Sequence, residues 1–328
     1  MIFEFLQEIQ PPVKLGTDID EIRDKLFKLE LSSLDYKEQM ADLDLSEGCI
    51  TVKGGSNMPF KILKPAFDQW LSRAKIPLSY AYDIPFDMLY YNLERRSKQK
   101  NRVILVRTRT CGKNAITLGS SEYDVIRAIL TERYNVLQNS QCFHEFKEVI
   151  CWADMSITES SVSEKMFRAI AAGEAKISDE VATGIEMVNG ETGWCSLELN
   201  TILKTENTYM IVTDTKNTTK FNLKMIHLQK DIKNKMQVHA KQIIENLDLF
   251  KDYIDNAKKI DMRVSDIMKV KDRMDIIVGR QETRELVEQL ENKNKFQAAE
   301  MLAQYGDDLT DQEKQRLTKI CAGSLIMS

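Results

Sequence analysis

The sequence predicts an α+β fold, with N-terminal helices, a mainly antiparallel sheet core and a C-terminal helical tail. Two observations carry this prediction. From about residue 184 to 229, short runs rich in alternating or β-branched residues are separated by Asn, Gly, Asp and Thr, which is typical of a meander of strands. From about residue 229 to the end there is no proline, and apolar residues recur at helical spacing.

Three helices are expected in the first hundred residues. Over 17–33, Thr17 and Asp18 are cap candidates, and the apolar residues that follow have helical spacing. The segments 63–77 and 84–100 each carry a proline near the start, which suits the first turn of a helix.

Strands are expected over 49–55, which alternates and stops at paired glycines, and over 102–110, which is rich in β-branched residues. The segment 126–134 fits a strand or a helix, because periodicity does not separate the two over so few residues. The segment 165–182 is expected to be helical. Within the C-terminal tail, breaks are expected at Gly279 and at the "QYGDD" stretch.

These elements divide the chain into three regions: an N-terminal helical segment (1–45), an α+β core (46–230) and a helical C-terminal region (231–328). Hydrophobic and charged contents of 43% and 29% are those of an ordinary globular protein. The start of the sequence lacks the pattern of a signal peptide, and no apolar run reaches the roughly 18 residues that span a bilayer. We therefore expect a soluble, cytoplasmic protein with reduced cysteines and no membrane partner.

The stretch "GIEMVNGETGWCSLELN" (184–200) is rich in glycine and lies between two expected strands. It lacks the lysine and spacing of a phosphate-binding P-loop, and it lacks the G-x-G-x-x-G pattern of a dinucleotide fold. Asn189-Gly190 instead favours a two-residue hairpin turn, with a bulge at Gly193.

The same stretch resembles the N-S-E-x-G-x-x-S-L motif of an uncharacterised phage and plasmid family that includes LtrC-like proteins. Upstream, "IRAILTERYNVLQN" is similar to a second segment of that family. The shared positions are Arg127, Ala128, Leu130, Arg133, Tyr134 and Asn139 in that segment, and Asn189, Glu191 and Gly193 in the turn. Gly190 replaces the family's serine, and "ILKTENTYMIV" lacks its usual R-L-x-C-T-N-G. The resemblance covers about residues 45–230 and implies a phage or plasmid context, hence a host-cell cytoplasm, without implying an activity.

One stretch stands out by charge in a chain whose net charge is −4. Between positions 95 and 113 there are eight cations and no acid. If these cations face water as one strip, they could follow a phosphate backbone, and nearby tyrosines could stack on bases. The predicted nucleic-acid-binding residues are Arg95, Arg96, Lys98, Lys100, Arg102, Arg107, Arg109, Lys113, Arg127, Arg133 and Tyr134. Arg107 and Arg109 are expected to share one strand face.

A second basic run, 216–241, holds seven lysines against one acid. For both runs the alternative is an ordinary solvated face. Cys142, His144 and Cys151 lack a fourth ligand at zinc spacing, so no metal and no cofactor is expected.

The leading hypothesis is a non-enzymatic DNA-metabolism protein that binds single-stranded or annealing DNA as a replication or recombination accessory. The alternative is a structural or interaction protein that forms a homo-oligomer through its C-terminal helices. Whether the protein is an enzyme stays open. A site around Glu191, Arg127 and Tyr134 is the arrangement that would make it one.

Overall fold

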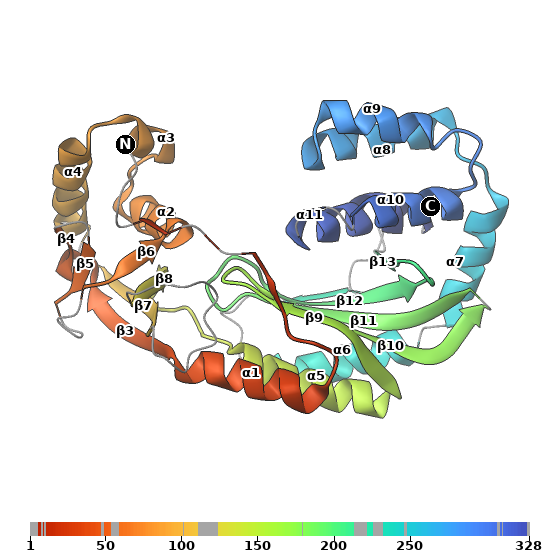
Figure 1. Cartoon of the computed structure of the whole chain (residues 1–328), viewed down its shortest axis with the longest axis horizontal. Helices are drawn as coiled ribbons and strands as arrows, with labels where there is room; N and C mark the ends of the chain where they lie inside the picture. Colours follow the sequence, from red (N-terminus) through yellow and green to blue (C-terminus); the bar gives the residue numbers. More distant parts are fainter. Residues whose placement is uncertain are drawn as a thin grey trace.

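The chain is described by a computed structural model. The described residues are 6–7, 9, 11–46, 49–53, 59–100, 102–110, 124–178, 180–212, 222–225, 232–245, 248–306, 309 and 311–326. The α+β class is confirmed, because mainly antiparallel sheets are combined with helices and a helical C-terminal region (Figure 1). The strands are β1 (Leu6–Gln7), β2 (Val13–Lys14), β3 (Ser33–Gln39), β4 (Leu43–Ser46), β5 (Cys49–Val52), β6 (Lys61–Leu63), β7 (Val103–Arg109), β8 (Val125–Thr131), β9 (Met155–Val162), β10 (Phe167–Ser178), β11 (Val181–Asn189), β12 (Leu197–Lys204), β13 (Tyr209–Ile211) and β14 (Asn222–Met225). The helices are α1 (Ile19–Leu31), α2 (Lys64–Ala74), α3 (Leu78–Asp83), α4 (Phe86–Gln99), α5 (Asn139–Trp152), α6 (Ile232–Glu245), α7 (Asp248–Lys259), α8 (Val264–Ile277), α9 (Arg280–Glu288), α10 (Lys295–Tyr305), α11 (Asp311–Arg316) and α12 (Gly323–Ile326), with a short 3-10 turn at Met40–Asp42 and a π-helical turn at Leu317–Ala322.

A seven-stranded antiparallel sheet forms the centre of the larger lobe. Its order is β13-β12-β11-β10-β9-β2, and β14 also pairs with β12. Helices α1, α5 and α6 cover one face, while α7 and the later helices cover the other (Figure 1). Both faces of the sheet are therefore buried, and the strands between them have little contact with water.

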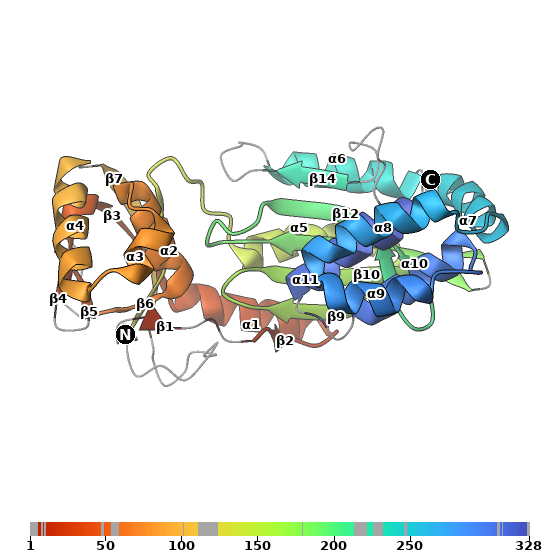
Figure 2. The same ribbon diagram turned by 90° about the horizontal axis from the view of Figure 1, so that it is seen from above.

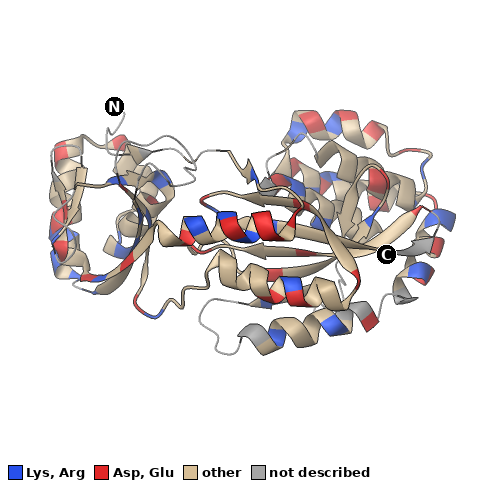
Figure 3. Ribbon diagram, turned by 60° about the horizontal axis from the view of Figure 1, so that its bottom comes forward, with Lys and Arg blue, Asp and Glu red and all other residues tan. Residues whose placement is uncertain are grey.

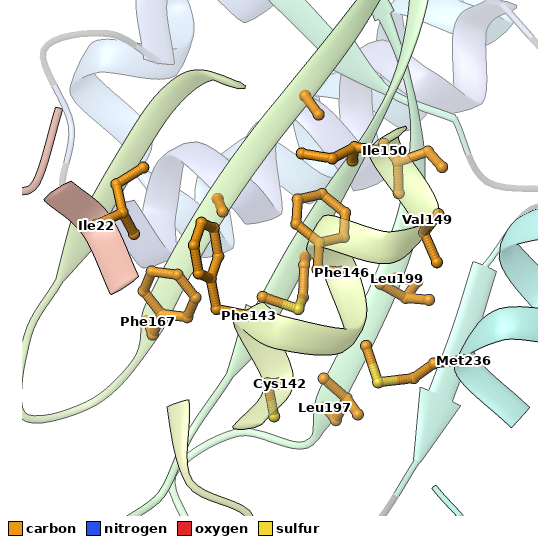
Figure 4. Close-up of a cluster of buried hydrophobic side chains, with 14 of the residues drawn as sticks. Ile22, Cys142, Phe143, Phe146, Val149, Ile150, Phe167, Leu197, Leu199 and Met236 are labelled. Atoms are coloured by element: carbon orange, nitrogen blue, oxygen red, sulfur yellow. The ribbon is translucent and has the colours of Figure 1, made fainter. Parts of the chain in front are cut away.

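The core under the first face is built around α5. Phe143 and Phe146 of this helix project toward the sheet, between residues of α1, β10 and β12 (Figure 4). The ring of Phe143 meets the ring of Phe167 edge to face, with centroids 5.9 Å apart and planes at 82°. Such a pair adds about 0.5–1.5 kcal/mol to the stabilisation that its area provides.

A five-stranded sheet, ordered β1-β6-β8-β7-β3, forms the smaller lobe at the other end of the molecule (Figures 1 and 2). Strands β1, β6 and β8 are parallel, whereas β7 runs antiparallel to both of its neighbours. Helices α2 and α4 cover one face, where Trp70 is buried and donates to Ser97 Oγ at 3.2 Å. Strands β4 and β5 form a separate hairpin against this core.

The structure confirms the three N-terminal helices, the strand at 102–110 and the meander. It also confirms a strand at the start of 49–55, where β5 lies, while positions 54 and 55 are outside the described residues. Asp18 caps α1, because its side chain accepts from the backbone amide of Glu21 at 2.8 Å. The ambiguous segment 126–134 contains strand β8. The helical tail is also confirmed, with a break at Gly279, which has a φ of 96°, and another after α10.

Two expectations are wrong. The segment 165–182 is not helical: it holds β10, which pairs with β9 and β11. The segment 1–45 is not only helical, since β3 pairs with β7 of the small sheet and β2 pairs with β9 of the large one. It therefore belongs to both sheets rather than preceding them. Among the described residues, no helix is both long and apolar enough to cross a membrane.

Candidate functional site

Three arginines that were predicted to bind nucleic acid lie inside the protein. Arg107, Arg109 and Arg127 have exposed fractions of 0%, 5% and 4%. They form ion pairs with Glu164 and Glu191, which are also buried. We call these five residues the arginine–glutamate cluster. The prediction that these arginines face water is wrong, because carboxylates brought in from distant parts of the chain neutralise them.

A bulge in β8 puts the three arginines together. Arg107 of β7 is opposite Ala128, but the next residue, Thr108, is opposite Ile126. Arg127 is therefore an extra residue in β8, and such a bulge changes the direction of the side chains around it. As a result Arg127 reaches the carboxylates that also bind the two arginines of β7.

Glu164 lies in the turn between β9 and β10 and joins two of these arginines. Its Oε1 accepts from Arg109 Nη1, and its Oε2 accepts from Arg127 Nε at 2.6 Å. Burial alone would raise the pKa of Glu164, but Arg127 and Arg109 outweigh burial and hold this pKa below its ordinary value. Glu164 is therefore ionised at neutral pH.

Glu191 lies in the connection between β11 and β12. Its Oε1 accepts from the backbone amide of Asn139 at 2.6 Å, the first residue of α5, where a negative charge favours the helix. Its Oε2 lies 3.4 Å from the terminal nitrogens of Arg127 and 3.8 Å from Nη1 of Arg107. One carboxylate thus joins the large sheet, the start of α5 and the small sheet.

Arg107 also donates hydrogen bonds through all three of its side-chain nitrogens. Its Nε donates to Asp35 of β3 at 2.8 Å, and its Nη2 donates to Gln138 Oε1 at 3.1 Å. Its Nη1 donates to the backbone oxygen of Glu191 at 2.9 Å. With Asp35 included, three carboxylates balance three guanidinium groups.

The glycine turn differs from the expected two-residue hairpin. β11 ends at Asn189 and β12 starts at Leu197, so the connection runs over 190–196. The residue with positive φ is Gly193 (77°), whose amide donates to the oxygen of Gly190 at 3.1 Å. Gly190 is required for a different reason, since a Cβ there would lie 2.6 Å from Sγ and 2.8 Å from N of Cys195.

The two segments that carry the family resemblance are in contact. The Tyr134 hydroxyl donates to the oxygen of Gly190 at 3.0 Å. Asn189 Nδ2 donates to the oxygen of Leu137 at 3.0 Å and to Asn139 Oδ1 at 2.8 Å. The residues of the glycine turn therefore serve to hold β11, β12 and α5 against the small lobe.

The grouping proposed as an enzyme site is also brought together here, since Glu191 contacts Arg127 and lies beside Tyr134. Burial, the largest effect, raises the pKa of Tyr134 well above its ordinary value, so the phenol keeps its proton. The arrangement is that of a structural junction between two sheets.

The other predicted cations have different environments. Arg95, Arg96, Lys98, Arg102 and Arg133 are exposed, and Lys100 is half-buried. Lys113 lies outside the described residues. Lys98 Nζ is 2.6 Å from Glu94, and Figure 3 shows basic and acidic residues intermixed on the helices.

The second basic run has its described cations in several settings. Lys224 pairs with Glu198 at 3.0 Å, and Lys241 lies 5.8 Å from the ring centroid of Trp152. His239 is buried. Positions 213–221 and 226–231 lie outside the described residues.

Metal ligation was not expected, and no group of three or more His, Cys, Asp or Glu in the described part of the chain could hold a metal ion. On α5, Cys142 is fully buried, whereas His144 and Cys151 are exposed. The C-x-H-x6-C spacing therefore does not converge on one point.

A second buried ion network lies in the large sheet and was missed from the sequence. Arg168 donates to Glu186 Oε1 at 2.8 Å and to Glu159 Oε1 at 3.0 Å, and it also donates to the Tyr209 hydroxyl. Asn200 donates to the other oxygen of Glu186 at 2.9 Å. These side chains satisfy one another within the sheet.

Comparison of the chain with protein-family models, with curated proteins and with solved structures found no match in any of the three.

Three partners of the arginines were also missed from the sequence: Glu164 within the cluster, and Asp35 and Gln138, which bind Arg107. The signal that could have suggested them is the setting of Arg107 and Arg109, which end the strongly apolar run "VILV". A strand this apolar is often buried, and charged side chains in a buried strand need an internal partner.

Proposed function

We propose that the protein is a nucleic-acid-binding accessory of phage or mobile-element DNA metabolism, and that it binds through the outer side of α4 rather than through β7. The surface consists of Tyr91, Arg95, Arg96, Lys98, Lys100 and Arg102, which we call the α4 surface. The observation that carries the proposal is a stripe on this helix. Tyr91, Arg95 and Lys98 are spaced four and three residues apart, so they share one side.

The composition of this stripe suits single strands. Tyr91 is 60% exposed, so its ring is accessible to a ligand. A base could stack on it, while the neighbouring cations contact phosphates. One acid, Glu94, lies beside the stripe and pairs with Lys98. The resemblance to a phage and plasmid family supports the biological setting of the proposal.

A competing explanation is that cations near the end of α4 only stabilise the helix. Basic side chains in the last turn interact favourably with the helix dipole. This explanation predicts that their removal lowers the melting temperature without affecting any ligand. Binding and stability therefore have to be measured on the same variants.

The test is fluorescence anisotropy with a labelled oligo-dT across a salt series. Contact with about four phosphates gives a log–log salt slope of about −3, or roughly a 60-fold loss of affinity from 50 to 200 mM salt. The double variant Arg95→Ala/Lys98→Ala should bind weakly and with a shallower slope, and Tyr91→Ala should cost about 1–3 kcal/mol if a base stacks there.

The matched control is Lys259→Ala/Lys269→Ala, which removes two exposed cations from α7 and α8. This control should keep the affinity of the wild-type chain. The proposal fails if the wild type does not bind at 50 mM salt, or if the α4 and control variants lose affinity equally.

A second candidate function, self-assembly, is favoured by α8. Val264, Met268 and Ile276 are 78%, 51% and 82% exposed on the outside of this helix. Apolar side chains exposed in a row are often contact surfaces. A second copy of the chain is the simplest partner for a homo-oligomer. Light scattering of the wild type and of Ile276→Glu tests it, and a monomeric wild type at 100 μM rejects it.

A further inference from the structure

The guanidinium group of Arg109 has an open edge inside the protein. Nη1 donates to Glu164, whereas Nε and Nη2 are buried without a hydrogen-bond partner in the part of the chain that the structure describes. Nε and Nη2 point along the same edge of the planar group. This edge matches two oxygens of a phosphate or a carboxylate, which is the usual bidentate arrangement.

The other two arginines of the cluster have no such edge. Arg107 donates through Nε, Nη1 and Nη2 to three different partners. Arg127 donates through Nε to Glu164 and through Nη1 and Nη2 to Glu191. Arg109 is therefore the arginine of the cluster with unused hydrogen-bond donors, although only 5% of the residue is exposed.

The neighbouring carboxylates leave this edge of Arg109 without an acceptor. Both oxygens of its partner Glu164 are already occupied, one by Arg109 Nη1 and the other by Arg127. Asp35 completes the balance of the cluster only at a distance, because it pairs with Arg107 and keeps 30% of its side chain exposed. Burial and then the neighbouring Arg127 lower the pKa of Arg109 to about 10. Burial disfavours the charged form, and the second cation nearby adds to this effect.

We infer that the Nε–Nη2 edge of Arg109 is a binding site for a small oxyanion, a phosphate or carboxylate group. A buried donor pair without an acceptor is rare, and an anion on this edge would satisfy both donors. The site is separate from the α4 surface and does not depend on the proposal of nucleic-acid binding. Because the edge is buried, it takes a small ion or the end group of a ligand rather than the backbone of a polymer.

The test is thermal unfolding in phosphate, sulfate or acetate, each compared with chloride at the same ionic strength at pH 7. A ligand that binds only the folded state raises the melting temperature in proportion to ln(1 + [L]/Kd), by about 2 °C at ten times its Kd. Phosphate or sulfate would identify a tetrahedral oxyanion, and acetate would identify a carboxylate.

Arg109→Lys is the decisive variant. Its ammonium keeps a positive charge for Glu164 but lacks the bidentate edge, so the anion-dependent rise should disappear. Arg107→Lys is the matched control, because the donors of Arg107 are all used: its melting temperature should be lower in chloride, but the rise with anion should remain. Arg95→Ala should keep the whole rise, which excludes binding at the α4 surface.

Two results would overturn the inference: no rise above chloride in any of the three anions, or an equal rise in the wild type and Arg109→Lys. If Arg109→Lys does not fold, crystals of the wild type grown in selenate decide the question without a variant. The anomalous signal of selenium should lie within hydrogen-bond distance of Nε and Nη2 of Arg109. Its absence from this edge would count against the site.

Discussion

Replacing Glu191 by alanine is expected to destabilise the fold by about 3–5 kcal/mol, the usual cost of removing one partner from a buried ion pair. The structure gives the reasons. The carboxylate accepts from the amide of Asn139 at 2.6 Å and faces Arg127 at 3.4 Å. Without it, Arg107 and Arg127 stay in the interior, where three guanidinium groups are left with Glu164 and the partly exposed Asp35. Glu191→Gln keeps an acceptor for Asn139, so it should lose only the charged part, about 2 kcal/mol.

The assay is urea unfolding followed by circular dichroism, with the free energy of unfolding compared at a constant m-value. At roughly 2 °C per kcal/mol for a chain of this size, Glu191→Ala should melt about 6–10 °C lower than the wild type. The control is Glu94→Ala, whose partner Lys98 is exposed and whose effect should be small.

The order expected for the loss of stability is Glu191→Ala, then Glu191→Gln, then Glu94→Ala. If Glu191→Ala were no more harmful than Glu94→Ala, the arginine–glutamate cluster would not be holding the two sheets together. The account of the glycine turn would then have to be abandoned.

Three further outcomes follow from other residues. Gly193→Ala should cost about 1–3 kcal/mol in thermal unfolding, because its φ of 77° is one that a residue with a side chain rarely adopts. Gly306→Ala, at a φ of −63° and with its nearest neighbour atom at 3.3 Å, should cost less, and equal losses would contradict this reasoning. Iodoacetamide at pH 8 should modify exposed Cys151 well before Cys321, as mass spectrometry can show, and equal rates would mean that Cys321 is not buried. Burial raises the pKa of Cys321 from 9.0 to about 12, so the contribution of its neutral thiol to stability is complete below pH 9 and is lost as pH rises toward 12. The free energy of unfolding should therefore fall less steeply between pH 9 and 12 in Cys321→Ala than in the wild type.

Local sequence signals were sufficient for much of the fold. The prolines at positions 65 and 85 lie at the starts of α2 and α4, and Asp18 caps α1. Such features act over one helical turn, so a short window contains the cause. The alternation that predicted the strand meander also has a short range.

The error over 165–182 has a different origin. β10 contains Ala169, Ala171 and Ala172, and alanine is the best helix former. In the structure these residues are buried between α5 and the helices on the other face, where small side chains let layers approach. Gly184 of the neighbouring strand is opposite Ala172, and a Cβ there would lie 2.1 Å from the oxygen of Ala171. Tertiary packing has overridden intrinsic propensity.

The arginines of β7 and β8 were misread because their partners are far away in sequence. Arg109 and Glu164 are 55 positions apart, and Arg127 and Glu191 are 64 apart. Composition over 95–113 records the cations and cannot include these acids. The residues of the glycine turn were identified from the sequence, but their role was not, because it depends on where Tyr134 and α5 lie in space.

The separation between the arginines and their acids matters during synthesis. A ribosome releases Arg107, Arg109 and Arg127 well before Glu164 and Glu191, so the nascent chain at first contains Arg109 and Arg127 without the carboxylates that pair with them. Strands β7 and β8 cannot be desolvated cheaply until they meet the turns of the second sheet. The smaller lobe is thus expected to mature only after the middle of the polypeptide has emerged, and a fragment that stops short of Glu164 should remain open and prone to aggregate.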